Sequence, residues 1–346
     1  MNQSQINSKK TISVLGAGSW GTALASLLSS NAHDVYLWGR NNEHIASLNK
    51  SHVNDKYLPD IILNKNLKFT SDFDFAVSKS DFIVLATPSN TLEIILNKIK
   101  AILDINKLSK KLILTSKGFN KTTGAFLTDS IDSIFSSTFD YNIEYGVISG
   151  PSFAIDLAQG LPTSVVMAAK NQNLAKNLAL LFHNNNFRVY DGNDIYGVQL
   201  GGAVKNIIAF MAGIADGLKL GSNSYAALIT RGLNEIMRLG EALHVNPKTL
   251  IGLSGLGDLV LTAGDNKSRN RRFGLYMAEG NSVDQAIKAV GQTVESQFAV
   301  KYAYKYAKKY NLDLPITTQA YNILYNNLPI KEAIKNLLDR EQKSEF

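Results

Sequence analysis

The chain has 346 residues, of which 45% are hydrophobic and 19% are charged. This length suits about two domains, and this composition is typical of a globular protein rather than a disordered one. The sequence contains no cysteine. Disulfides, thiolate zinc sites, iron–sulfur clusters and a cysteine nucleophile are therefore excluded. The formal net charge of +7 is spread along the chain, which weakly favours anionic ligands but does not by itself indicate nucleic acid.

The five histidines are scattered without the HxxxH or HExxH spacing of a metal site, so we expect no histidine-based metal centre. The N-terminal stretch MNQSQINSKKT is polar and lacks the apolar core of a secretory signal. No window approaches the ~18 uninterrupted apolar residues of a membrane span. These features predict a soluble, cytoplasmic α/β protein.

Short β-branched apolar runs alternate with longer amphipathic runs through the first half of the chain. The predicted strands are Ile12–Leu15, Asp34–Trp38, Asp81–Ala86, Lys111–Thr115, Tyr145–Ser149, Thr163–Ala169 and Phe187–Tyr190. The predicted helices between them are Gly21–Asn31, Thr91–Leu103 and Ala175–Phe182. Alternation of this kind predicts a doubly wound, mostly parallel sheet covered by helices on both faces.

Helical periodicity replaces the strand pattern after Asp191. Glycines at 201, 202, 213 and 217 within such a segment each cost about 0.5–1 kcal/mol relative to alanine, so they predict close helix packing or backbone contact with a ligand. We therefore expect a flexible tail over residues 1–10, a dinucleotide-binding domain over 11–192, a helical substrate-binding domain over 193–340 and a short tail over 341–346.

The strongest local motif is Gly16-Ala17-Gly18-Ser19-Trp20-Gly21, directly after a predicted strand and directly before a predicted helix. In a dinucleotide-binding turn, Gly16 would permit the tight turn, Gly18 the approach of a pyrophosphate, and Gly21 the close packing of helix on strand. The alternative is a tight turn between strand and helix that binds no ligand. NAD-preferring sites place an acid about 20 residues further on, but Arg40 stands near that position. A guanidinium suits a 2′-phosphate, which favours NADP(H), although Arg40 could also be an ordinary surface residue.

Two loops follow predicted strands at the edge where open α/β sheets collect ligands. Thr115–Gly118 contains Lys117, and Ser149–Ala154 contains Gly150 and Ser152. A solvated lysine and a plain turn with Ser152 as a helix cap remain alternatives.

Lys205 is a single charge among small and apolar neighbours, and Asp258 is isolated in a similar setting. A buried lysine suits proton transfer near neutral pH, and a buried carboxylate needs a cation or hydrogen-bond donors, so the two residues would suit each other. The alternatives are a snorkelling lysine and a helix-capping aspartate.

A third cluster, Asn266–Phe273, brings three arginines, Ser268 and Asn270 to a predicted helix start. It predicts an anion site, while a solvated basic turn is the alternative and a nucleic-acid patch is disfavoured because interleaved aromatic residues are missing.

Seven segments together resemble the bacterial glycerol-3-phosphate dehydrogenase family, which uses NAD(P)+. In chain order they are GAGSWGTALA, TSKG, SGPSFA, GVQLGGAVKN, ALITRGLNEI, GLSGLGDLVLT and NKSRNRRFG. The resemblance extends from about Thr11 to Leu338 and implies a Rossmann domain, an all-helical second domain and a homodimer. It implies reduction of dihydroxyacetone phosphate to sn-glycerol 3-phosphate for glycerophospholipid synthesis, with NADPH/NADP+ or NADH/NAD+ as cofactor.

The resemblance also implies roles for individual residues. Lys205 would be the general acid/base. Contacts to the cofactor would come from Ser19, Trp20, Arg40, Lys117, Ala154, Arg269, Thr293 and Glu295. Contacts to the substrate would come from Lys117, Gly150, Ser152, Lys205, Asp258, Ser268, Arg269 and Asn270. Relatives often carry an aliphatic residue at the position of Thr293, so its role requires a contact through backbone, and the segment 132–144 would be a family-variable insertion.

Two other functions compete with this interpretation. A related lysine-dependent dehydrogenase could act on a 2- or 3-hydroxy acid, with the basic cluster holding a carboxylate. A dinucleotide-binding sensor without turnover would not need Lys205 and Asp258.

Overall fold

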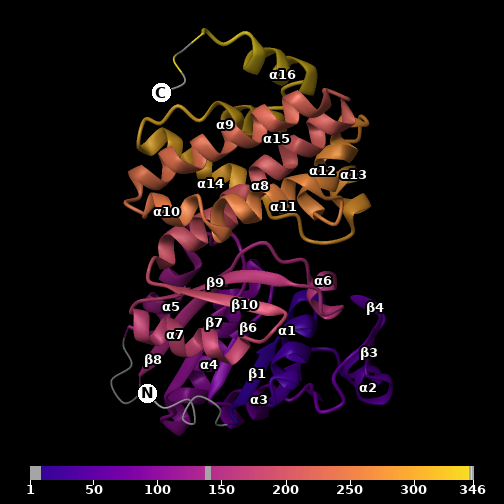
Figure 1. Cartoon of the computed structure of the whole chain (residues 1–346), viewed down its shortest axis with the longest axis vertical. Coiled ribbons are helices and arrows are strands. Elements are labelled where there is room, and N and C mark those ends of the chain that lie inside the picture. Colours follow the sequence, from indigo (N-terminus) through magenta and orange to yellow (C-terminus); the bar gives the residue numbers. More distant parts are fainter. Residues whose placement is uncertain (1–8, 137–141, 343, 345–346) are drawn as a thin grey trace. The chain divides into compact units, whose positions relative to one another are not determined.

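The computed structural model describes residues 9–136, 142–342 and 344. They form two compact units, one that ends at Gln199 and one that begins at Leu200 (Figure 1). The tails expected at 1–10 and 341–346, and the variable segment expected at 132–144, lie partly outside the described residues.

The first unit is built on a sheet with the strand order β10-β9-β8-β7-β6-β1-β2-β5. Every neighbouring pair is parallel except β8 and β9. The strands are β1 (Thr11–Leu15), β2 (Asp34–Trp38), β5 (Lys68–Thr70), β6 (Phe82–Leu85), β7 (Lys110–Leu114), β8 (Ile143–Ser149), β9 (Thr163–Ala169) and β10 (Phe187–Gly192). The predicted doubly wound, mostly parallel sheet is confirmed, and each predicted strand is present.

The central strands are apolar because both faces of the sheet are covered. Val84 of β6 and Ile113 of β7 belong to the core on one face, whereas their neighbours Ile83 and Leu112 belong to the core on the other. All four side chains are fully buried. Alternation between two cores explains why these strands are continuous apolar runs rather than alternating apolar and polar residues.

Seven helices of the described chain accompany the sheet: α1 (Ser19–Ser30), α2 (Asn42–Ser51), α3 (Phe73–Lys79), α4 (Leu92–Asn106), α5 (Leu127–Phe135), α6 (Ala154–Ala158) and α7 (Gln172–Phe182). The predictions of α1, α4 and α7 are confirmed. A small antiparallel hairpin, β3 (Val53–Asn54) and β4 (Leu58–Ile62), follows α2 and was not predicted.

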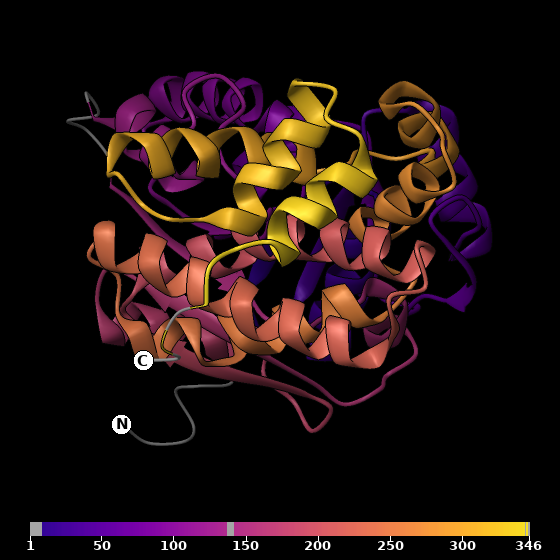
Figure 2. The ribbon, with the colours of Figure 1, turned by 90° about the horizontal axis from the view of Figure 1, so that it is seen from above.

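The described residues of the second unit form helices without strands, as the pink to yellow ribbons of Figures 1 and 2 show. They are α8 (Ile195–Gly217), which begins before Leu200, α9 (Gly221–Ala242), α10 (Pro247–Leu250), α11 (Asp258–Gly264), α12 (Arg269–Ala278), α13 (Val283–Val290), α14 (Ser296–Lys309), α15 (Pro315–Tyr325) and α16 (Ile330–Leu338). A π-helical turn, Leu253–Gly257, leads directly into α11. The predicted all-helical second domain is confirmed.

Helix α8 is the core of the second unit. It is long and apolar enough to cross a bilayer by length and composition, but 94% of its most apolar window is buried within the fold, as expected of a core helix. Its glycines permit close backbone contacts, because a Cβ atom at Gly201 would overlap the carbonyl oxygen of Ser254 and one at Gly213 would overlap that of Arg271. The predicted close packing at these glycines is confirmed.

Candidate active site

The glycine-rich turn between β1 and α1 has the geometry that a dinucleotide requires. Gly16 has a φ of +124°, and a Cβ atom there would lie 2.7 Å from the carbonyl oxygen of Ala86. A Cβ atom at Gly21 would overlap the carbonyl oxygen of Gly16, so this glycine lets α1 begin directly against the turn. At Gly18, by contrast, an added Cβ atom would meet no described atom within 4 Å. Space is therefore left beside the turn where a pyrophosphate would approach.

The N-terminus of α1 is suited to an anion. Its N-cap, Gly18, provides no side-chain cap, and its first turn contains no acidic residue. The first amide groups of a helix point outward and carry partial positive charge. The residues of this turn therefore fit the phosphates of a nicotinamide dinucleotide.

Arg40 lies beside this turn. The amide of Gly16 donates to the carbonyl oxygen of Trp38 (3.0 Å), which ties the turn to the end of β2. Arg40 is exposed two residues further on. Its position at the carboxyl end of β2 is where dinucleotide-binding folds contact the ribose or a 2′-phosphate.

The β3–β4 hairpin holds the turn from outside, which the sequence did not indicate. Asn54 is fully buried, and its side-chain amide donates to the carbonyl oxygen of Ala17 (3.2 Å) and to the Oγ1 atom of Thr22 (2.8 Å). The hydroxyl of Ser19 donates to the backbone oxygen of Tyr57 (2.8 Å). The pattern NDKYLPD offered only turn-forming residues as a signal, not the long-range contacts.

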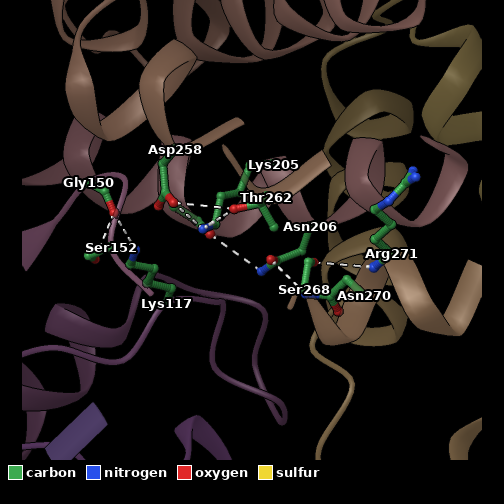
Figure 3. A network of polar contacts seen from close by, with 11 residues as sticks. Lys117, Gly150, Ser152, Lys205, Asn206, Asp258, Thr262, Ser268, Asn270 and Arg271 are labelled. Carbon is green, nitrogen blue, oxygen red and sulfur yellow. Dashed lines mark hydrogen bonds and ion pairs between the residues drawn. The ribbon is translucent and has the colours of Figure 1, made fainter. Parts of the chain in front are cut away.

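Lys117 and Gly150 meet at the carboxyl edge of the sheet. Lys117 follows β7, Gly150 follows β8, and the Nζ atom of Lys117 donates to the carbonyl oxygen of Gly150 (2.8 Å). Ser152 donates its hydroxyl to the same oxygen (2.9 Å), as Figure 3 shows. Gly150 has a φ of +146°, and a Cβ atom there would lie 2.9 Å from the Cα atom of Val165, so only glycine suits this position. The predicted edge residues are therefore brought together.

Two buried hydroxyls at the same edge have no hydrogen-bond partner among the described residues. They belong to Thr87, just after β6, and to Ser149, the last residue of β8. Both side chains are more than nine-tenths buried. Buried hydroxyls are normally paired, so their position at the ligand-binding edge marks them as candidate ligand contacts that sequence reasoning missed.

In the second unit, Lys205 and Asp258 form a buried ion pair (Figure 3). Their side chains are 7% and 1% exposed, which excludes the snorkelling lysine. The helix-capping alternative is also wrong, because the N-cap of α11 is Gly257 and Asp258 is the first residue of the helix. Thr262 accepts a hydrogen bond from the Nζ atom of Lys205 (2.8 Å) and donates to Asp258 (3.3 Å). The ammonium thus has both a counter-ion and a hydroxyl partner, which is what a buried charge requires.

The packing of α8 on the π-helical turn brings this pair together. Gly201 lies one helical turn before Lys205 and contacts the backbone of Ser254, while Gly255 fits against the carbonyl oxygen of Leu250, where a Cβ atom would overlap. The turn ends at Gly257, directly before Asp258, the first residue of α11. Thr262 follows Asp258 by four residues, so both lie on one face of α11. That spacing was the available sequence signal for Thr262.

A second polar chain begins at the next residue of α8. Asn206 accepts a hydrogen bond from the side-chain amide of Asn270 (2.8 Å), and Asn270 in turn accepts one from the backbone amide of Ser296 (2.9 Å). Asn270 thereby links α8, α12 and the start of α14. These bonds use the Oδ1 atom and one N–H group of the Asn270 side chain. The predicted substrate contact would use the other N–H group.

Arg269 and Glu295 interact at the converging starts of α12 and α14. Ser268 caps α12 by accepting from the amide of Arg271 (3.3 Å). Arg269 is exposed. Its guanidinium interacts electrostatically with the carboxylate of Glu295. Thr293 and Glu295 are half-buried in the segment that leads into α14.

The prediction that three arginines form one anion site is wrong for Arg271. Its guanidinium points inward, donating to Asp216 (2.7 Å), Asn266 (2.9 Å) and the carbonyl oxygen of Ala212 (3.3 Å). It therefore attaches α12 to α8 instead of contributing to an anion site. Gly274 is buried and lies three residues after Arg271, on the same face of the helix, and that spacing was the available sequence signal for which arginine turns inward.

The comparison with protein families covers almost all of the chain. The N-terminal family model of NAD-dependent glycerol-3-phosphate dehydrogenase matches residues 11–175, and the C-terminal model matches residues 194–335. The chain belongs to the NAD-dependent glycerol-3-phosphate dehydrogenase family.

Individual relatives agree with this assignment to the family. A glycerol-3-phosphate dehydrogenase (NAD(P)+) of Halorhodospira halophila is 42% identical over 97% of this chain and 98% of its own length. Another, of Bartonella tribocorum, is 44% identical over 97% of this chain and 100% of its own length. The crystal structure of a glycerol-3-phosphate dehydrogenase of Coxiella burnetii is 38% identical, with a TM-score of 0.89 over 96% of this chain and 99% of that one. The resemblance inferred from seven short segments is confirmed.

Proposed function

We propose that this chain reduces dihydroxyacetone phosphate to sn-glycerol 3-phosphate with NADPH or NADH, and that Lys205 is the general acid. Membership of an NAD(P)-dependent oxidoreductase family supports the reaction. The buried pair of Lys205 and Asp258 is the observation that carries the residue assignment.

The cofactor would be held by the glycine-rich turn and its neighbours. Gly16, Gly18 and Gly21 shape the turn, and the start of α1, with Ser19 and Trp20, offers backbone amides to the phosphates. We assign further cofactor contacts to Arg40, Lys117, Ala154, Arg269, Thr293 and Glu295. When bound, the nicotinamide supplies the hydride to the carbonyl carbon.

Proton delivery falls to Lys205. Reduction of a ketone requires one proton on the carbonyl oxygen, and a positioned ammonium can donate it. Asp258 favours the charged form of the amine, and Thr262 fixes the direction of one N–H bond. The neutral amine left after donation keeps both partners and can accept a proton in the reverse reaction.

The anionic end of the substrate would be held by Arg269, with Ser268 and Asn270 beside it. Hydrogen bonds to a charged group contribute about 1.5–3 kcal/mol each, and a guanidinium matches the geometry of a phosphate. We assign further substrate contacts to Lys117, Gly150 and Ser152, as the resemblance implies.

The finer aspects of this function rest on single residues or on the resemblance. Arg40 favours NADPH over NADH, because a guanidinium suits the additional phosphate. A homodimer and a supply of product to glycerophospholipid synthesis are expected from the resemblance, and a cytoplasmic location is expected from the sequence features; these complete the proposal. Nucleic acid is not an expected partner.

A spectrophotometric assay tests the proposal. Oxidation of NADPH by the purified protein should follow dihydroxyacetone phosphate and hardly follow dihydroxyacetone, since a site with buried polar groups that lose their partner can discriminate by about 10⁴. Equal rates with both ketones would show that the protein does not recognise the phosphate group of the substrate. Faster turnover of a 2- or 3-keto acid would instead identify a hydroxy-acid dehydrogenase.

A further inference from the structure

The loop after β7 carries Lys117 and is organised around the side chain of Asn120. Asn120 is 5% exposed. Its Oδ1 atom accepts hydrogen bonds from the backbone amides of Thr122 (2.8 Å) and Thr123 (3.0 Å). Its backbone amide donates to the carbonyl oxygen of Ala125 (2.9 Å). These bonds close the loop into a compact turn.

The other end of the same side chain attaches this turn to two helices. The Nδ2 atom of Asn120 donates to the Oε1 atom of Glu93 on α4 (2.6 Å) and to the hydroxyl of Ser130 on α5 (2.9 Å). Ser130 donates to the same oxygen of Glu93 (3.2 Å). The orientation of the amide is determined by chemistry, because a carboxylate can only accept and the backbone amides of the loop can only donate.

Lys117 lies between this anchor and a second one. On the other side of it, Ser116 donates its hydroxyl to the carbonyl oxygen of Thr87 (2.6 Å). The backbone is therefore held one residue before Lys117 and three residues after it. Between these points the Lys117 ammonium reaches the carbonyl oxygen of Gly150 (2.8 Å).

We propose that Asn120 is a positioning residue for Lys117, acting through its hydrogen bonds to Glu93 and Ser130. This inference rests on the proposed function, in which Lys117 contacts the substrate. Because a small displacement of a positioned group can cost a large factor in catalysis, loss of the anchor should weaken substrate binding without any change in the groups that touch the substrate.

The substitution Asn120→Asp tests this role. The new carboxylate retains the bonds from the amides of Thr122 and Thr123 but faces the carboxylate of Glu93. Two carboxylates this close do not both ionise readily, so they repel each other at high pH and can share a proton at low pH. We expect the KM for dihydroxyacetone phosphate to rise about tenfold at pH 8 with a smaller change in kcat, and to approach the wild-type value at pH 6.

The substitution Glu93→Gln provides the matched control. Alone, it retains an oxygen that can accept from Asn120, so its KM should equal that of the wild type. Combined with Asn120→Asp, it supplies an amide that donates to the new carboxylate, so the double variant should recover the wild-type KM and lose the additional pH dependence. A non-additive pair of this kind is the signature of a direct interaction.

Three outcomes are distinguishable. A raised KM that Glu93→Gln restores supports the proposal. A lowered melting temperature at unchanged KM and kcat would show that Asn120 only stabilises the fold, and it would overturn the proposal. Wild-type protein that does not turn over dihydroxyacetone phosphate would refute the proposed function, independently of Asn120.

Discussion

The backbone of Gly201 touches the backbone of Ser254 so closely that a Cβ atom at position 201 would overlap the carbonyl oxygen of Ser254. This contact lies one helical turn before Lys205 and four residues before Asp258. The distance between Lys205 and Asp258 therefore depends on the absence of a side chain at Gly201.

The substitution Gly201→Ala should separate α8 from the turn that carries Asp258. We expect a loss of stability of roughly 1–3 kcal/mol and a fall in kcat, because Asp258 moves away from Lys205. Gly192→Ala is the matched control, since its Cβ atom would lie 3.8 Å from Val166, an ordinary contact. Thermal melting and steady-state kinetics of both variants check this, and wild-type kcat in Gly201→Ala would contradict it.

Arg269 and Arg271 should respond in opposite ways to substitution. Arg269→Met removes the exposed guanidinium assigned to the phosphate, so the KM for dihydroxyacetone phosphate should rise roughly ten- to a hundredfold with little change in melting temperature. Arg271→Met removes the inward bonds to Asp216, Asn266 and Ala212, so it should lower the melting temperature. The same effect of both substitutions on KM would show that the two arginines do not differ in function.

These two arginines show why the site could be predicted only in part. The sequence indicated a basic helix start, but which guanidinium turns inward depends on how α12 packs against Gly213 of α8. Lys205 and Asp258 were recognised as isolated charges that would suit each other, whereas the packing that brings them together joins segments 53 residues apart and leaves no local pattern in the sequence.

The fold, like the site, could be predicted from the sequence only in part. The central strands were predicted because each is a continuous buried run. The β3–β4 hairpin was not, because its strands are short and most residues of β4 are exposed, which leaves no apolar pattern. Its contribution to the glycine-rich turn comes from one buried amide, that of Asn54, and no periodicity reveals such a contact.

Arg40→Asp should change the cofactor preference. An acid at the end of β2 can accept bonds from ribose hydroxyls and repels a 2′-phosphate, so the ratio of kcat/KM for NADPH to that for NADH should fall. Arg40→Gln, which removes the charge without reversing it, should give an intermediate ratio. An unchanged ratio in both variants would show that Arg40 points away from the cofactor.

Glu235 should make stability depend on pH. Burial raises the pKa of its carboxyl to about 7, opposed by hydrogen bonds from Thr317 and Ile316 and by the charge of Arg238. Since the folded-state pKa lies above the ordinary value of 4.5, the neutral form stabilises the fold below pH 4.5. This contribution decreases by about 1.4 kcal/mol per pH unit as the pH rises towards 7.

Melting curves of the wild type and of Glu235→Gln at pH 5 and pH 8 check this expectation. The glutamine resembles the neutral acid and does not titrate. The advantage in melting temperature of the wild type over the variant should therefore shrink from pH 5 to pH 8. A constant difference would show that Glu235 is ionised throughout this range, held by its three donors at the start of α15.

The turnover of Lys205→Met tests the central claim most directly, with Lys288→Met, which removes an exposed lysine of α13, as the control. We predict that Lys205→Met folds, binds NADPH with wild-type affinity and loses at least about a hundredfold in kcat with dihydroxyacetone phosphate, while the control is unaffected. A kcat within a few fold of the wild type in Lys205→Met would contradict the assignment of proton transfer to this amine.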